Sequence, residues 1–122
     1  MLKEQKLGLA VRGDGEFITK DSGKRLEFKS GMMRDVADDK PDYTLVWHPF
    51  LLRLVQLLGR GLKKYGRDNW KKAEGKEELD RFKQSALRHL YQYLEGDKSE
   101  DHQSAVVFNI MGSMYVESKM NK

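Results

Sequence analysis

Residues 49–66 read PFLLRLVQLLGRGLKKYG, and this stretch decides the fold of the chain. Its apolar side chains recur at steps of three and four residues, which is the spacing of one helix face. They are Phe50, Leu51, Leu54, Val55, Leu58 and Leu62. Pro49 suits the start of a helix, because its missing N–H would have no partner there, and Gly66 suits the end. The sequence therefore predicts an amphipathic helix from Pro49 to about Lys64.

Two further helical patterns follow this one. Residues 77–94 carry an acidic first turn, a regular apolar stripe and Gly96 just beyond the end. The last pattern begins at Ser99 as N-cap and extends to about residue 120, and Gly112 within it favours close contact with a neighbouring helix. Only a few residues join these two segments, so we expect them to be antiparallel neighbours.

The N-terminal residues favour β-strands instead of helices. Residues 16–19 and 25–28 are rich in β-formers, and the polar, Gly-bearing residues 20–24 between them predict a hairpin turn. Together the patterns predict a mainly α fold, a helical bundle of about three helices with a small N-terminal β-hairpin. We expect one domain over residues 1–122, with a hairpin-containing arm at 1–30, a loop at 31–48 and the helical body at 49–120.

Composition limits the class of protein. With 122 residues and 39% apolar side chains, the chain can bury one modest core, and the lack of cysteine excludes disulfides, thiolate metal sites and a cysteine nucleophile. Neither a long apolar segment nor the apolar core of a signal peptide occurs, so we expect a soluble, cytoplasmic protein that does not bind membranes. The net charge of +4 favours small anionic ligands as much as nucleic acid.

Residues 63–70, KKYGRDNW, concentrate cations, aromatic rings and an amide where the first helix should end. Lys64 and Arg67 suit phosphate oxygens, and Tyr65 or Trp70 suits stacking on a base. The same residues also have a purely structural interpretation. Cations are common at helix C-termini, and a tryptophan is often a core anchor.

Polar side chains recur at helical spacing in the last two predicted helices. His102 and Asn109 lie seven residues apart and hence on one face, and His89 should be about level with them across the bend. The acidic bend at residues 95–101 could hold Mg²⁺, which prefers carboxylate oxygens. A buried histidine with only a structural role and a solvated acidic cap are the alternative interpretations.

Four motifs in order resemble the phage-borne dATP/dGTP diphosphohydrolase N-terminal domain family. They are KPDY at 40–43, KYGRDNW at 64–70, SALRHL at 85–90, and Gly96 with the acids, His102 and Asn109 that follow. The resemblance covers roughly residues 28–117. It implies a mainly helical domain related to the all-α nucleoside triphosphate pyrophosphohydrolases, which use Mg²⁺ to split a nucleoside triphosphate into monophosphate and pyrophosphate and commonly act as oligomers.

The resemblance also implies roles for single residues. His89, Asp101, His102 and Asn109 match the family's histidine, acid and amide positions, and Arg34 and Asp35 match an Arg-Asp before the lysine-proline loop. We therefore expect a phage nucleotide pyrophosphohydrolase that acts with Mg²⁺ on a purine deoxynucleoside triphosphate in the host cytoplasm, as a homo-oligomer. The expected catalytic residues are His89, His102 and Asn109; the substrate-binding residues are Arg34, Lys40, Lys64, Tyr65, Arg67, Asn69 and Trp70; the metal ligands are Asp97, Glu100 and Asp101.

Two alternatives from other functional classes stay open. One is a non-catalytic nucleotide-binding or host-interaction module that keeps the pocket without turnover. The other is a small basic nucleic-acid-binding protein, whose affinity should fall steeply with salt.

Overall fold

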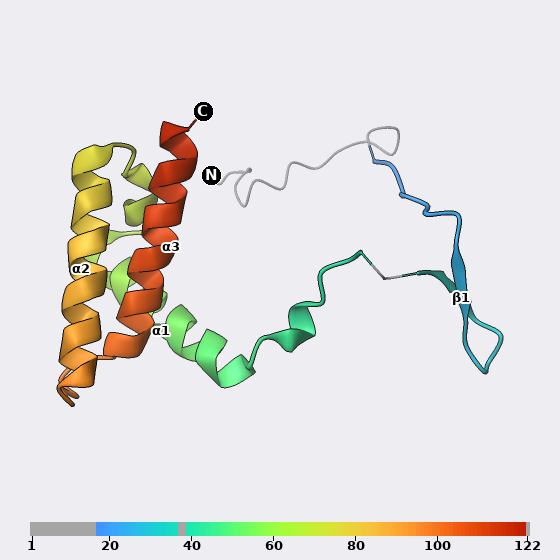
Figure 1. Ribbon diagram of the computed structural model, residues 1–122, viewed down its shortest axis with the longest axis horizontal. Coiled ribbons are helices and arrows are strands. Elements are labelled where there is room, and N and C mark those ends of the chain that lie inside the picture. Colours follow the sequence, from blue (N-terminus) through green and yellow to red (C-terminus); the bar gives the residue numbers. More distant parts are fainter. Residues whose placement is uncertain (1–16, 37–38, 122) are drawn as a thin grey trace. The chain divides into compact units, whose positions relative to one another are not determined.

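A β-hairpin and three α-helices make up the part of the chain that the computed structural model describes, residues 17–36 and 39–121 (Figure 1). Contacts divide the chain into two units, Met1–Asp42 and Tyr43–Lys122. The hairpin belongs to the first unit and the helices to the second. The predicted mainly α class with a small N-terminal hairpin is confirmed.

The hairpin pairs strand β1, Arg25–Glu27, with strand β2, Met33–Asp35, in antiparallel register. Gly31 adopts a φ of 90°, a conformation open to glycine, and its N–H donates to the carbonyl of Phe28 at 2.9 Å. The predicted hairpin between residues 16–19 and 25–28 is therefore wrong, because β1 pairs with β2 across this turn. Residues 17–19 form no strand, and the second strand comes instead from the segment predicted to be a loop; Glu16 lies outside the described residues.

The helices are α1, His48–Tyr65, α2, Lys76–Leu94, and α3, His102–Met120. The first two agree with the predicted bounds to within a residue. The N-cap of helix α3 lies two residues later than predicted, because Asp101 takes this role and accepts from the Ser104 N–H at 3.2 Å. The predicted cap, Ser99, instead donates its own N–H to Asp97 at 2.7 Å. Two short 3-10 turns, Tyr43–Leu45 and Asn69–Lys72, complete the second unit.

Helices α2 and α3 lie antiparallel and form the most extensive contact between the helices (Figure 1). The ring of Phe82 on α2 covers Gly112 on α3, where a Cβ atom would lie 2.6 Å from the ring Cζ. Beside this contact lies a small core of Ala73, Leu79 and the fully buried Val116. The predicted close contact at Gly112 is therefore confirmed.

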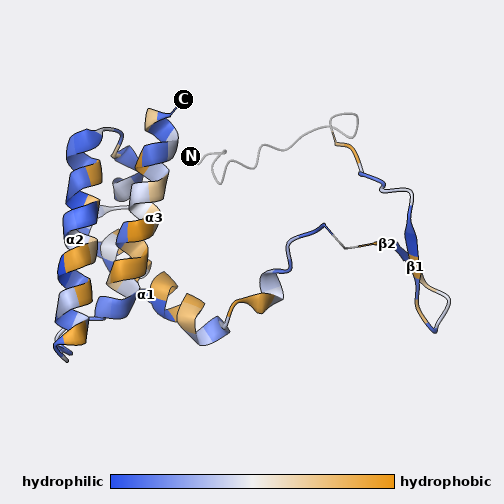
Figure 2. Ribbon diagram, viewed as in Figure 1, coloured by the Kyte–Doolittle hydropathy of each residue, from blue (hydrophilic) through white to orange (hydrophobic). Residues whose placement is uncertain are grey.

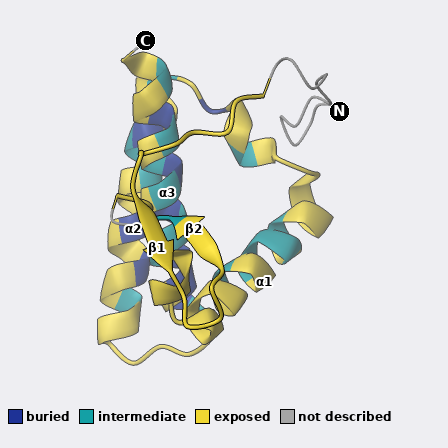
Figure 3. Cartoon of the chain, turned by 90° about the vertical axis from the view of Figure 1, so that its right-hand side faces the viewer, coloured by how far each residue is buried: buried dark blue, intermediate teal, exposed yellow. Residues whose placement is uncertain are grey.

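Helix α1 is attached more loosely. Its N-terminal half extends beyond the α2–α3 pair, its apolar residues are visible in Figure 2, and none of its residues is buried (Figure 3). Arg53 fastens it to the start of α3, where its guanidinium donates to both carboxylate oxygens of Asp101 and also to Gln103. No helix among the described residues has the length and apolar character needed to span a membrane.

We expect Gly112→Ala to lower the free energy of unfolding by about 1–3 kcal/mol, because the added methyl group would clash with Phe82. Urea unfolding followed by circular dichroism measures this. Gly59→Ala on α1 is the matched control, since a Cβ there meets nothing within 4 Å. That change should leave stability equal or raise it by up to about 1 kcal/mol through helix propensity. An equal response of both variants would contradict the proposed packing.

Candidate functional site

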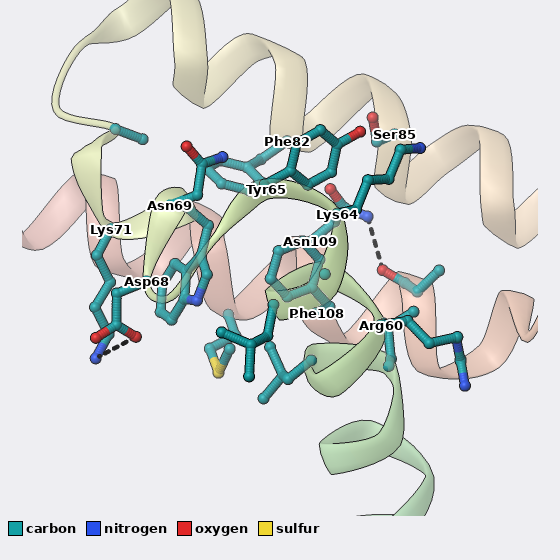
Figure 4. Close-up of a pocket in the computed structure, with 18 of the residues that line it drawn as sticks. Arg60, Lys64, Tyr65, Asp68, Asn69, Lys71, Phe82, Ser85, Phe108 and Asn109 are labelled. Carbon is teal, nitrogen blue, oxygen red and sulfur yellow. Dashed lines mark hydrogen bonds and ion pairs between the residues drawn. The ribbon is translucent and has the colours of Figure 1, made fainter.

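A groove of about 1190 Å³ lies where the end of α1 and the following turn meet α2 and α3 (Figure 4). Gly66 ends α1 with a φ of 89°, and Asp68 follows in a left-handed conformation with a φ of 56°. These two conformations turn the chain back toward α2 and bring Arg67 and Asn69 to the groove. The groove is large enough for a ligand of nucleotide size.

The groove is positively charged. Six cations and three carboxylates line it; the cations are Arg60, Lys64, Arg67, Lys71, Lys72 and Arg81. Of these, only Lys71 has an ion pair among residues 17–36 and 39–121, with Asp68 at 3.4 Å. Two of the carboxylates are also engaged, Asp68 with that lysine and Glu78 with the backbone N–H groups of residues 74 and 75 at 3.0 Å. An anionic ligand would meet five cations that have no ion-pair partner in the described chain.

Two aromatic side chains from the KKYGRDNW segment differ in their surroundings. Trp70 packs edge-on against Phe108, with ring centroids 5.9 Å apart, and against Tyr115 at 5.2 Å. Tyr65 is 60% exposed at the groove, and the Lys64 Nζ lies 5.1 Å from its ring centroid. Trp70 is thus a packing anchor that also lines the groove, whereas the Tyr65 ring has a free surface for a ligand.

His89 and His102 face each other across the α2–α3 hairpin, with their Nδ1 atoms 2.8 Å apart. Both side chains are buried. Burial lowers the pKa of His89, the charge of Arg88 lowers it further, and the nearby Glu100 partly opposes this. Burial therefore favours the neutral form of the His89 imidazole, which is hydrogen-bonded to His102.

Asn109 lies on the same helix as His102, and its hydrogen-bond partner lies outside the histidine pair. Its amide Nδ2 donates to the carbonyl of Ala105 at 2.7 Å, one turn back along α3. The side chain is buried and lines the groove together with His89. The structure thus brings His89, His102 and Asn109 into one region, although only the two histidines are bonded to each other.

The three predicted metal ligands do not form a cage. Asp101 is bound by Arg53 and Ser104, and Asp97 accepts from the Ser99 N–H and lies 3.5 Å from His102. Glu100 alone lines the groove. Over the ranges 17–36 and 39–121, no group of three or more acidic or histidine side chains is placed to hold an ion. The carboxylates do not fit a ready-made magnesium site, because two of them already serve as caps and ion pairs.

Arg34 and Lys40 belong to the N-terminal unit. Arg34 lies on β2 opposite Leu26, and Lys40 lies 3.8 Å from Asp35. The carboxylate of Asp35 also accepts from the hydroxyl of Ser22 at 2.5 Å. Their phosphate-binding role stays a prediction.

Several residues of the groove were not predicted from the sequence, among them Arg60, Arg81 and Ser85. Arg60 precedes Lys64 by one helical turn, and Arg81 and Ser85 precede His89 by two turns and one turn. Helical spacing from residues already singled out could have found all three.

We expect the Arg53–Asp101 contact to stabilise the fold in a pH-dependent way. Burial raises the pKa of Asp101, but hydrogen bonds from Arg53 and Ser104 outweigh this and hold the pKa at about 2. The contribution is therefore present above the unfolded pKa of about 4 and is lost as the pH falls toward 2. At pH 7, Asp101→Asn should cost about 1–2 kcal/mol in urea unfolding, and the difference from wild type should shrink on acidification.

Glu117→Gln on the same helix is the control for that experiment, because Glu117 is exposed and has no ion pair in the described chain. It should change stability by less than about 0.5 kcal/mol at either pH. A pH-independent effect of Asp101→Asn would contradict the role of the charge.

Comparison with known proteins identifies the family. A family model described as dATP/dGTP diphosphohydrolase, N-terminal, matches residues 30–122, well over half of the chain. No curated protein and no solved structure matches. The match spans the KKYGRDNW segment, both histidines of the buried pair and Asn109, so it includes the whole groove. The chain belongs to the dATP/dGTP diphosphohydrolase N-terminal family.

Proposed function

We propose that this chain binds a purine deoxynucleoside triphosphate in the groove and hydrolyses it to the monophosphate and pyrophosphate. The observation that carries the proposal is the set of five groove cations without ion pairs, Arg60, Lys64, Arg67, Lys72 and Arg81. A triphosphate is the kind of ligand whose charge such a cluster would neutralise. The family to which the chain belongs supports a nucleotide of this class.

The two ends of the ligand would meet different parts of the groove. Phosphate oxygens suit Arg60, Lys64 and Arg67, which lie on the α1 side and in the turn after it. Tyr65 offers an exposed ring for stacking on the base, which typically contributes about 1–3 kcal/mol. Asn69 and Asn109 supply amides that can hydrogen-bond a base or sugar.

In the proposed reaction, Mg²⁺ would arrive bound to the phosphates of the substrate. Mg²⁺ usually keeps several waters and is held by one or two carboxylates together with substrate phosphates. Glu100 is the one member of the predicted trio that lines the groove. We propose Glu100, not a cage of Asp97, Glu100 and Asp101, as the carboxylate that a magnesium triphosphate would meet.

The reaction follows from these positions. A water oxygen bonds to a phosphorus of the α–β linkage, the bridging P–O bond breaks, and the leaving phosphate oxygen takes the electron pair. The groove cations oppose the charge that builds on the phosphate oxygens. The water must lose a proton, and His89 of the buried histidine pair lines the groove, where it could accept it.

A nucleotide-binding module without turnover is the second candidate. Asp97 and Asp101 already accept hydrogen bonds from Ser99 and Arg53, and this favours a module that binds nucleotide without a metal cage. Such a module would keep the cations and Tyr65 and would bind nucleotide as tightly as an enzyme. Hydrolysis, not binding, separates the two candidates.

Incubation of the purified chain with each of the four dNTPs and Mg²⁺ tests the proposal. We expect release of pyrophosphate and monophosphate, separated by anion-exchange chromatography, with a purine dNTP preferred. Lys64→Ala and Arg67→Ala should each weaken nucleotide binding by about 10–100-fold, because each removes a charged hydrogen bond. Lys83→Ala on α2, exposed and outside the groove, is the matched control and should have little effect. Absence of pyrophosphate with every dNTP would eliminate the enzyme, and thermal stabilisation by nucleotide would then favour the binding module.

We also propose a homo-oligomer that forms through α1. Leu52, Val55 and Leu62 lie on one stripe of this helix and are 46%, 52% and 45% exposed. The apolar stripe is continuous with the groove, which Val55 and Leu62 also line. An apolar face of this kind is more typical of an interface than of a monomer surface.

Sedimentation velocity tests this association. We expect a dimer or larger species for the wild type and a shift toward monomer for Leu52→Glu, since a buried carboxylate would oppose docking of a second copy. Gln56→Glu adds the same charge at an exposed polar position of α1 and serves as control. A monomeric wild type at micromolar concentration would refute the proposal.

A further inference from the structure

A row of three polar side chains leads from the bend between α2 and α3 to the groove. Asp97 in the bend places Oδ2 3.5 Å from the Nε2 of His102. The Nδ1 of His102 lies 2.8 Å from the Nδ1 of His89, and His89 lines the groove. The row therefore joins a partly exposed carboxylate at one end to an imidazole at the proposed ligand site at the other.

The carboxylate end of the row fixes the proton of His102. The carboxylate of Asp97 accepts from the Ser99 N–H at 2.7 Å, and an ionised carboxylate can only accept. The Nε2 of His102 is buried and has no hydrogen bond among the described residues, and Asp97 is the group that faces it. A buried N–H directed at a carboxylate is favourable, whereas two facing acceptors would repel. His102 therefore carries its proton on Nε2.

The contact with His102 also determines which nitrogen of His89 carries the proton. A neutral imidazole has one N–H, so the Nδ1 of His102 is an acceptor. The Nδ1 of His89 lies at hydrogen-bond distance from that acceptor and must be the donor. Its other nitrogen, Nε2, then carries a lone pair. This nitrogen has no hydrogen bond in the described chain and is not among the buried polar atoms that lack a partner, so it keeps contact with solvent.

We infer that His89 presents the lone pair of Nε2 to the groove and is the proton acceptor, while His102 and Asp97 are positioning residues that hold it in this tautomer. The chemical role rests on the proposed function, whereas the proton order rests on geometry alone. In the proposed reaction the proton of the attacking water passes to His89 Nε2 as the new O–P bond forms and the bridging P–O bond breaks. With the opposite order, His89 would present an N–H to the groove and could accept no proton.

Two-bond ¹H–¹⁵N correlation spectra of the full chain test the proton order directly. At about pH 8, above the ordinary pKa of a histidine side chain, we expect unprotonated nitrogen signals for His89 Nε2 and His102 Nδ1, and protonated ones for the other two nitrogens. His48, exposed on α1, is an internal reference, and His89→Gln and His48→Gln assign the signals. A protonated Nε2 in His89 would overturn the inference whether or not the chain is an enzyme.

A pair of variants at His102 tests the positioning role. His102→Gln keeps an acceptor for the His89 N–H, whereas His102→Phe fills similar space without one. We expect the Phe variant to lose about 100-fold in kcat with KM changed less than about threefold, and the Gln variant to stay within about tenfold of wild type. Equal losses in two variants that both show the wild-type circular dichroism would overturn the role of His102. If the wild type hydrolyses no dNTP, the proposed function fails, and the spectra still decide the proton order.

Discussion

The close approach of α2 and α3 is the contact on which the other features of the helical unit depend. Gly112 lets the ring of Phe82 lie directly on the α3 backbone, and seven residues further along α2, His89 meets His102. The two contacts belong to one antiparallel register. A larger side chain at position 112 would therefore push the helices apart, lengthen the 2.8 Å contact between the imidazoles and displace one wall of the groove. The small size of Gly112 is thus required both for the helix packing and for the contact between the two histidines.

Much of this architecture could be read from the sequence, because local signals determine it. Pro49 and Gly66 mark the ends of α1, and the apolar spacing predicts all three helices closely. The hairpin was predicted with the wrong partner strand, since a polar Gly-bearing turn at residues 20–24 looked as good as the one that Gly31 makes. When two possible turns lie close together in the chain, the local sequence does not show which one forms. That depends on which strands each turn would bring together. The same limit applies to the start of α3, where Ser99 and Asp101 are both good caps and contacts inside the fold, such as the ion pair of Asp101 with Arg53, favour the second.

The candidate site could be predicted only in part, because the sequence does not show which side chains meet in space. Residues contiguous with a helix end, such as Lys64, Tyr65 and Arg67, do line the groove, because one turn of the chain carries them there together. Carboxylates close in sequence do not have to converge in space. Asp97 and Asp101 lie in one short bend, yet one binds backbone and a histidine and the other binds an arginine of α1. They were predicted to bind a metal because they cluster in the bend and because Asp101 matches an acid position of the family, whereas hydrogen bonds inside the fold already engage them.

The cations of the groove and the order of protons in the histidine row have separate consequences for function. Cations that attract a triphosphate lower the free energy of the bound substrate and of the transition state together, so by themselves they favour binding more than catalysis. A lone pair directed at the ligand acts only when a proton is transferred. The Nε2 of His89 is therefore the atom at which a nucleotide-binding module and a hydrolase with this same groove would differ. Its availability is controlled from the far end of the row, since the carboxylate of Asp97 determines which nitrogen of His102 is protonated and hence which nitrogen of His89 is free. In the proposed reaction, Asp97, which lies in the bend and outside the groove lining, thus governs whether bound nucleotide can be attacked.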